Sequence, residues 1–193
     1  MVKNCKVYSN EDYHSGDGML TNVWGPSLWH YLHIISFNYP INPTKENKKY
    51  YRQLINNLKY TLPCKYCRDN LKNNLNDHPL TATALKNRYN FSIWMYELHE
   101  HINKMLGKKS GLKYDQVRER YEHFRARCTI DGSKKKIQNK RKLKNKTQKK
   151  EKGCTKPLYG KKSKCIIKIV PHDTKCKTFQ MDNKCKKTRK NRK

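Results

Sequence analysis

The residues best suited to chemistry are two cysteines three positions apart. Cys64 and Cys67 stand in the run Leu-Pro-Cys-Lys-Tyr-Cys-Arg, and such a pair closes and reopens a disulfide with transfer of two electrons. Pro63 cannot continue a preceding helix, and the apolar residues after the pair recur at helical steps, so a helix is predicted to begin here. The dipole and free N–H groups of a first turn favour a thiolate. The spacing predicts thiol–disulfide exchange, with Cys64 nearer the helix start.

A zinc site is the alternative use of the same pair, and it needs two further ligands at suitable spacing. His99 and His101 are two residues apart, so on a helix they point in different directions, and Cys128 lies far along the chain. A thioredoxin domain, the usual host of a reactive Cys-x-x-Cys, needs a βαβ pattern that the sequence lacks. We therefore predict no metal in the core.

The elements that position the pair are predicted to be helices, because no segment alternates with a period of two. The fold class is all-α: a four-helix bundle plus a short fifth helix. In the first helix, Leu28, Leu32, Ile35 and Tyr39 form an inward stripe, with Trp29, His33 and Phe37 beside it. The first predicted helix runs from Trp24 to about residue 39, the second over about 45–60, and the third from the cysteine pair to about residue 76. The fourth covers about 85–106 and the fifth about 114–125. The fourth helix is predicted to bury Phe91, Trp94, Leu98, Ile102 and Met105.

The charge of +30 is unevenly distributed over the 193 residues. Residues 129–193 hold 25 Lys and Arg against four acidic residues, whereas residues 1–128 hold 20 and 11. This last part has too little apolar content to offset its ordering entropy. Three regions are predicted: a flexible leader over 1–17, a globular domain over 18–128, and a Lys-rich, largely disordered tail over 129–193.

The N-terminal residues are polar and lack the apolar segment of a secretory signal. No run of about 18 apolar residues exists, so no membrane span is expected. Eight cysteines without a signal peptide favour redox or metal chemistry inside a cell.

Four motifs in order carry a resemblance to a known family. Trp24-Gly25-x-x-x-Trp29-x-x-x-His33 is followed by Tyr39-Pro40, by Pro63-Cys64-x-x-Cys67-Arg68, and by Trp94-x-x-x-x-His99-x-x-x-Asn103 with Leu106-Gly107-Lys108. Together they resemble the Erv/ALR family of FAD-linked sulfhydryl oxidases, over about residues 24–121. The ending from Arg118 to Cys128 is most similar to members encoded by large DNA viruses of the mimivirus kind.

The resemblance implies FAD bound at the mouth of the bundle and a homodimer packed through the first two helices. It implies that Cys64 exchanges with the thiols of protein substrates or of a thioredoxin-like carrier. Cys67 would lie against the flavin, which passes the electrons to O₂ and yields H₂O₂. The implied FAD contacts are Gly25, Trp29, His33 and Tyr39 from the first helix, His99, Asn103 and Lys108 from the fourth helix and its exit, and Arg120 and Tyr121 from the fifth.

By the same resemblance the chain belongs to a viral disulfide-formation pathway in the host cytoplasm, at the viral factory, with packaging into the virion left open. Cellular members carry a pair of cysteines where this chain has Tyr96 and a residue near Tyr114, so that bridge is replaced without an orphan thiol. The family's His-Asn step reads His99-Glu100 here, which removes one polar contact.

Three interpretations of the tail compete. A solvated basic tail with incidental thiols is favoured over an electron relay and over non-specific nucleic-acid contact; a zinc site is weak because the cysteine spacings are wide. As a second function, the chain would be a basic nucleic-acid- or virion-binding protein on a redox-inactive core, which the intact cysteine pair argues against. The cysteines without an assigned role are Cys5, Cys128, Cys154, Cys165, Cys176 and Cys185.

Overall fold

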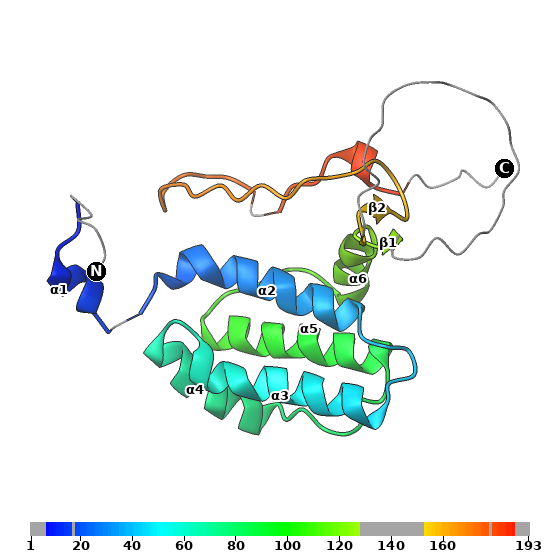
Figure 1. Ribbon diagram of the computed structural model, residues 1–193, viewed down its shortest axis with the longest axis horizontal. Coiled ribbons are helices and arrows are strands. Elements are labelled where there is room, and N and C mark those ends of the chain that lie inside the picture. Colours follow the sequence, from blue (N-terminus) through cyan, green and yellow to red (C-terminus); the bar gives the residue numbers. More distant parts are fainter. Residues whose placement is uncertain (1–6, 17, 128–152, 178, 188–193) are drawn as a thin grey trace, which may run out of the picture. The chain divides into compact units, whose positions relative to one another are not determined.

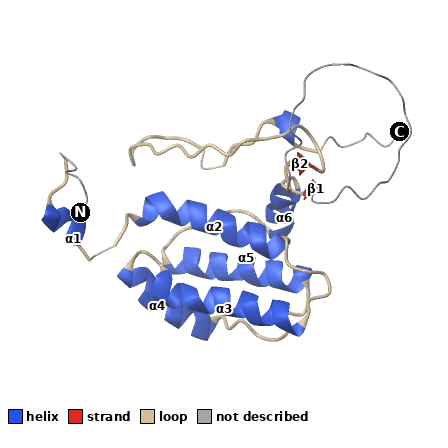
Figure 2. Cartoon of the chain, viewed as in Figure 1, coloured by secondary structure: helices blue, strands red, loops and turns tan. Residues whose placement is uncertain are grey.

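The computed structural model of the chain describes residues 7–16, 18–127, 153–177 and 179–187. The chain divides into two compact units, Met1–Val117 and Arg118–Lys193. Among the described residues of the first unit, the regular elements are all helices (Figures 1 and 2), which confirms the predicted fold class. They are α1 (Asn10–His14), α2 (Thr21–Phe37), α3 (Lys45–Thr61), α4 (Lys65–Asp77), α5 (Arg88–Met105) and α6 (Tyr114–Glu122), whose last residues belong to the second unit.

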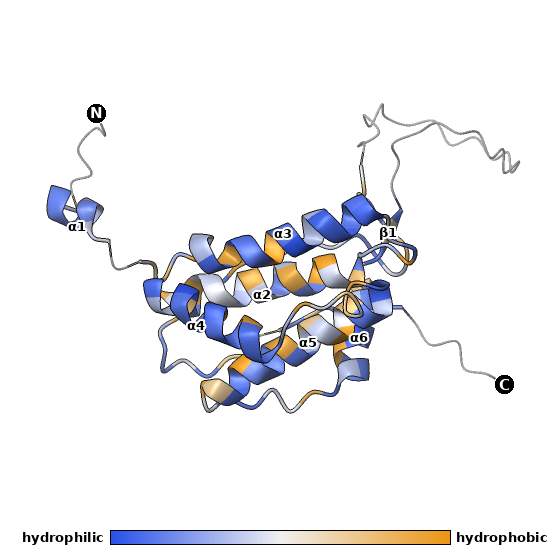
Figure 3. Cartoon of the chain, turned by 90° about the horizontal axis from the view of Figure 1, so that it is seen from below, coloured by the Kyte–Doolittle hydropathy of each residue, from blue (hydrophilic) through white to orange (hydrophobic). Residues whose placement is uncertain are grey.

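Helices α2 to α5 form the bundle: α2 packs against α5, α3 against α4, and α4 against α5 (Figure 1). Hydrophobic residues gather along α2 and α5, whereas α4 is mostly hydrophilic (Figure 3). The predicted burial of Met105 was wrong, because it lies in the last turn of α5 and is 45% exposed. The core consists of Leu32, Tyr39, Ile55, Leu80, Ala84, Leu85, Phe91, Trp94, Met95 and Leu98.

Local signals set most helix ends where they were expected. Thr44 begins α3 with a capping box, in which its hydroxyl accepts from the Asn47 N–H and the Asn47 side chain accepts from the Thr44 N–H. The helix ends at Thr61, because the backbone of a residue that precedes a proline is pushed out of the helical region. Asn87 caps α5, which therefore starts at Arg88, three residues later than predicted.

The start of α2 differs from the prediction. The helix begins at Thr21, three residues before Trp24, so Pro26 lies inside it and not in its first turn. Contacts from outside the helix hold this extra turn: the Trp24 indole N–H donates to the Met19 carbonyl at 2.9 Å, and the Met19 N–H donates to the Pro63 carbonyl at 2.7 Å. Tertiary contacts therefore outweigh the local proline signal.

Helix α1 lies in the segment predicted to be a flexible leader. Ser9 and Asp12 form a capping box at its start, which explains why five residues become helical. None of its residues is buried.

Tyr96 stands at one position, and Tyr114 near the other, where the resemblance implied a cysteine pair in cellular members. The rings of Tyr96 and Tyr114 meet edge to face at 5.9 Å. The Tyr96 hydroxyl donates to the Leu112 carbonyl at 2.8 Å, and the Tyr114 hydroxyl is hydrogen-bonded to the buried Ser92 hydroxyl at 2.8 Å. These contacts fasten the segment after α5 to the helix without a disulfide.

Replacing Tyr114 by phenylalanine is expected to lower the free energy of unfolding by about 1 kcal/mol, because the buried Ser92 hydroxyl loses a partner. Thermal or urea unfolding of the full chain measures the change. The control is Tyr60→Phe, since Tyr60 is 71% exposed and its variant should match the parent. Equal stabilities of the two variants would show that the hydroxyl contact contributes nothing.

The described part of the second unit contains little regular structure. Strand β1 (Ala126–Arg127) pairs antiparallel with β2 (Lys156–Pro157), and one 3₁₀ turn, η1, spans Asn183–Cys185. Cys154 is disulfide-bonded, whereas Cys165, Cys176 and Cys185 are free thiols. Cys5 and Cys128 lie outside the described residues. No helix in the described ranges has both the length and the apolar character needed to cross a membrane.

Candidate redox site

The cysteine pair lies at the start of α4, as predicted. Cys64 is the N-cap residue, and its sulfur accepts a hydrogen bond from the Cys67 N–H at 3.2 Å. Both residues are half-buried free thiols. A sulfur that replaces the usual cap oxygen is exposed to the free N–H groups and the dipole of the helix, which stabilise negative charge on it.

The surroundings shift the pKa values of the two thiols in opposite directions. A hydrogen bond from the Cys67 thiol is the main cause that lowers the pKa of Cys64, and the Cys67 N–H and the Thr21 hydroxyl act in the same sense. Burial raises the pKa of Cys67, and its hydrogen bond to Cys64 raises it further. Cys64 is therefore the first of the two thiols to ionise.

The basic neighbours of the pair are engaged elsewhere. The Lys65 ammonium forms an ion pair with Asp69 at 3.0 Å, and the Arg68 guanidinium donates to the Leu62 carbonyl at 2.6 Å. The hydrogen bonds to the two sulfurs come from the pair itself, the Tyr66 backbone and Thr21. Lys65 and Arg68 are thus ordinary helix charges, bonded to Asp69 and to the Leu62 carbonyl.

Three of the predicted cofactor residues form one cluster between α2 and α5. The rings of Trp29 and His99 stack with centroids 3.8 Å apart and planes 6° apart. His33 Nε2 and His99 Nδ1 are hydrogen-bonded at 3.0 Å, and the His33 ring also lies 6.2 Å from Trp29. Burial is the main cause that lowers the pKa of His33 to about 3 and that of His99 to about 4. The cluster is aromatic, polar and uncharged at neutral pH.

These two histidines make stability depend on pH. Each binds a proton more weakly when folded than when unfolded, where its pKa is about 6.5. The folded state is therefore favoured in full above pH 6.5, and stability is lost as the pH falls from 6.5 towards 4. We expect a loss of about 1.4 kcal/mol per histidine for each pH unit in that window.

Urea unfolding of the full chain between pH 7 and pH 4.5 measures this slope. His33→Asn is the comparison, because it removes one of the two titrations and should reduce the slope. A free energy of unfolding that stays constant over this range contradicts the assignment of buried, neutral histidines.

Gly25 and Tyr39, also predicted to contact the cofactor, have different surroundings. Gly25 is buried one turn before Trp29, and among the described residues a Cβ added there would meet only the Thr21 methyl, at 3.6 Å. The bundle itself therefore leaves room beside this glycine. Tyr39 is a fully buried core residue whose hydroxyl donates to the Leu85 carbonyl at 3.1 Å. The structure does not bring Tyr39 into the ring cluster, and its role at the cofactor stays a prediction.

Asn103 and Lys108 lie at the end of α5. The Asn103 side chain donates to the Glu100 carboxylate at 3.0 Å, so Glu100, which departs from the family's pattern, fixes the orientation of that amide. The Lys108 N–H donates to the Asn103 carbonyl at 2.8 Å, while the Lys108 side chain is exposed. The turn thus places the exposed Lys108 side chain after the polar end of the helix.

Arg120 and Tyr121 belong to the second unit, and their part in the site remains a prediction. The Arg120 guanidinium lies 5.7 Å from the centre of the Phe179 ring. Tyr121 contacts Phe124, with ring centroids 5.8 Å apart, and burial raises the pKa of Tyr121 to about 12.

Sequence reasoning missed Thr21. It is the first residue of α2, and its hydroxyl oxygen lies 3.7 Å from the Cys67 sulfur. Thr21, Gly25, Trp29 and His33 follow one another at four-residue steps along α2, so a single row of neighbours leads from the thiols to the ring cluster, over about 18 Å at 1.5 Å per residue. The i, i+4 spacing was visible in the sequence, but no local pattern linked Thr21 to a cysteine 46 residues away.

The site defines a class of protein: a dithiol–disulfide exchange protein on a helical bundle, with an uncharged aromatic cluster on the helix that contacts the thiols. In the described part of the chain, no group of three His, Cys, Asp or Glu residues could hold a metal ion. Residues 26–122 match the sequence pattern of the Erv1 / Alr family, and the chain belongs to that family.

Two viral relatives agree with this assignment. The chain is 39% identical over 104 residues to a probable FAD-linked sulfhydryl oxidase, R368, of Acanthamoeba polyphaga mimivirus, covering 54% of this chain and 72% of the relative. It is 35% identical over 86 residues to an FAD-linked sulfhydryl oxidase of African swine fever virus, covering 45% of this chain and 70% of the relative. The crystal structure of the yeast Erv1 core has 23% identity and a TM-score of 0.48, covering 62% of this chain and 94% of that structure.

Proposed function

We propose that this chain is an FAD-dependent thiol oxidase, which forms disulfides in substrate proteins and passes the electrons through FAD to O₂, giving H₂O₂. The observation that carries the proposal is the Cys64–Cys67 pair at the start of α4, with the two pKa values shifted in opposite directions. Its support is the similarity to viral relatives named as FAD-linked sulfhydryl oxidases.

Cys64 is the cysteine that exchanges with substrate. With the pair oxidised, a substrate thiolate attacks the Cys64 sulfur, the bond between Cys64 and Cys67 breaks, and Cys67 leaves as a thiolate. A second substrate thiolate then attacks the substrate sulfur of the mixed disulfide and releases Cys64. One substrate disulfide forms, and two electrons remain on the Cys64–Cys67 dithiol. The low pKa of Cys64 supports its role as the second leaving thiolate.

The residues of the bundle fit FAD. Planar rings such as Trp29 stack on heteroaromatic rings, and neutral imidazoles at His33 and His99 donate and accept hydrogen bonds without placing charge beside them. Asn103 adds an amide and the exposed Lys108 a cation suited to phosphate. Bound FAD supplies a two-electron acceptor that O₂ reoxidises, while the protein supplies position and thiolate character.

We infer a homodimer packed through α2 and α3. Its support is a set of large apolar side chains that remain exposed on these helices and the turn between them: Tyr31, Ile34, Ile41 and Tyr50. Exposed apolar surface of this kind is typical of an interaction site. The mass measured by light scattering during size exclusion tests the inference.

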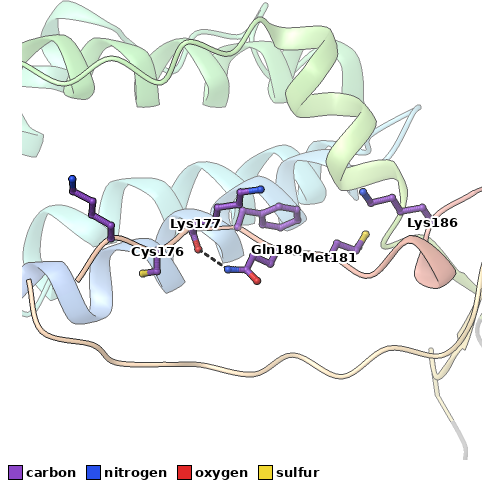
Figure 4. A pocket seen from close by; sticks show the side chains of 7 residues that line it. Cys176, Lys177, Gln180, Met181 and Lys186 are labelled. Atoms are coloured by element: carbon purple, nitrogen blue, oxygen red, sulfur yellow. Dashed lines mark hydrogen bonds between the residues drawn. The ribbon is translucent and has the colours of Figure 1, made fainter. Parts of the chain in front are cut away.

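The physiological substrates are thiol-containing proteins or a thioredoxin-like carrier, and the place of action is the viral factory in the cytoplasm of the infected host, with packaging into the virion left open. For the basic second unit, non-specific contact with nucleic acid is the second interpretation, after a solvated basic tail. A hollow of about 670 Å³ in it is lined by lysines together with Cys176, Phe179 and Met181 (Figure 4). Such lysines bind polyanions in a salt-dependent way.

A visible spectrum of the purified chain, before and after dithiothreitol is added in air, tests the function. A flavin band that bleaches and recovers, with H₂O₂ formed, is the expected result. A colourless protein that takes up no added FAD would instead favour the second candidate, a basic nucleic-acid- or virion-binding protein on a redox-inactive core.

A further inference from the structure

Thr21 and Cys67 bring a hydroxyl group to one sulfur of the redox pair. The Thr21 Oγ1 lies 3.7 Å from the Cys67 Sγ, although the two residues are 46 positions apart. The contact joins the first residue of α2 to the first turn of α4. Either atom is able to donate while Cys67 is a thiol, but once Cys67 is a thiolate the Thr21 hydroxyl is the one that carries a proton to donate.

Backbone contacts with Pro63 and Cys64 fix the position of Thr21. Gly18 forms an antiparallel bridge with Cys64, and the Met19 N–H donates to the Pro63 carbonyl. Gly18 has a φ of +116°, and a Cβ added there would come within 2.6 Å of the Pro63 oxygen, so only glycine permits this approach. The start of α2 is therefore fastened to the residues that precede the thiols.

The charged side chains near the pair do not form hydrogen bonds to the Cys67 sulfur in the described structure. The first turns of α2 and α4 contain no acidic residue, and Leu20, the N-cap of α2, provides no side-chain cap. The cations nearest in sequence, Lys65 and Arg68, are bonded to Asp69 and to the Leu62 carbonyl. Cys64 is the titratable group that faces Cys67. In the described part of the chain, the donors to the two sulfurs are thus backbone N–H groups, the thiols themselves and the Thr21 hydroxyl.

A leaving thiolate departs faster when its pKa is lower. Burial makes Cys67 a poorer leaving group because it raises the pKa of that thiol, whereas the hydrogen bond with the Thr21 hydroxyl lowers this pKa. The step that needs this help is the first exchange, in which the Cys64–Cys67 bond breaks and its electron pair stays on the Cys67 sulfur.

We propose that Thr21 is a catalytic residue whose hydroxyl donates a hydrogen bond to the Cys67 thiolate as it leaves. The bond that forms joins the substrate sulfur to Cys64, and the bond that breaks is the Cys64–Cys67 disulfide. The substrate thiol is oxidised and Cys67 is reduced, while the Thr21 proton stays on its oxygen. The inference rests on the proposed function and adds a residue to its exchange step.

Thr21→Val tests this role because it keeps the shape of the side chain and removes the hydroxyl. Two measurements need neither oxygen nor flavin turnover: the rate at which anaerobic dithiothreitol reduces the Cys64–Cys67 disulfide, and the pKa of Cys67 from pH-dependent alkylation in a Cys64→Ser background. We expect the rate to fall about threefold to tenfold and the pKa to rise by about half a unit to one unit. Thr21→Ser should restore both values.

Thr61→Val is the matched control, because Thr61 is exposed and its hydroxyl donates to the Asn57 carbonyl. It should leave both measurements at the parent values. An unchanged Cys67 pKa in Thr21→Val, or a Thr21→Ser variant as slow as Thr21→Val, would overturn the proposal and leave Thr21 a packing residue. A chain that binds no FAD would end the proposed function, yet both measurements would still report on Thr21.

Discussion

Replacing Cys67 by serine is expected to abolish dithiothreitol-driven oxygen consumption and to leave FAD bound. A serine cannot form the disulfide that accepts electrons, so the rate should fall at least about a thousandfold. An oxygen electrode measures the rate, and the visible spectrum after desalting measures the retained flavin. Cys64→Ser should lose activity equally, and it should fold well because serine is a favoured N-cap residue for α4.

Cys165→Ser is the matched control, since Cys165 is an exposed free thiol of the second unit. Its rate with dithiothreitol should equal that of the parent chain. If Cys67→Ser keeps a tenth or more of the parent rate, the electrons do not pass through this pair and the mechanism is wrong. If Cys165→Ser is slow, Cys165 is a relay residue and not an incidental thiol.

Replacing Trp29 by alanine is expected to weaken FAD binding at least about tenfold. The variant removes the ring that stacks on His99 at 3.8 Å and exposes the hydrogen-bonded pair of His33 and His99 to water. Trp29 is only half-buried, so the bundle should still fold. Titration of the flavin-free chain with FAD, followed by the quenching of flavin fluorescence, gives the dissociation constant.

Trp29→Phe is the informative comparison, because it keeps an aromatic ring at the same place on α2. It should retain most of the affinity lost in Trp29→Ala. Thermal unfolding without FAD separates a binding defect from a folding defect. An alanine variant with parental FAD affinity would show that the ring cluster lies outside the cofactor site.

Much of the site followed from short-range patterns. A proline before two cysteines three positions apart predicts a helix that starts with a sulfur near its first N–H groups. The structure agrees, because Cys64 is the N-cap residue of α4. Four-residue steps predict that Trp29 and His33 are neighbours, and their rings lie 6.2 Å apart. These features depend on the 3.6-residue repeat of one helix, which any stretch of sequence carries within itself.

Other features needed the folded chain. Leu80 and Leu85 fill the core from the connection before α5, although Leu85 was predicted to begin that helix, and Met105 is exposed although it follows the inward period. The start of α2 is set by contacts with Pro63 and not by Pro26.

The amino-acid sequence alone therefore determined the helical class, the redox pair and the family. Only the tertiary structure decided that His99 stacks on Trp29 and that the Thr21 hydroxyl reaches Cys67. The physical reason is that periodicity states which face of a helix turns inward. Which two inward faces meet, and in what register, depends on how all the side chains pack together.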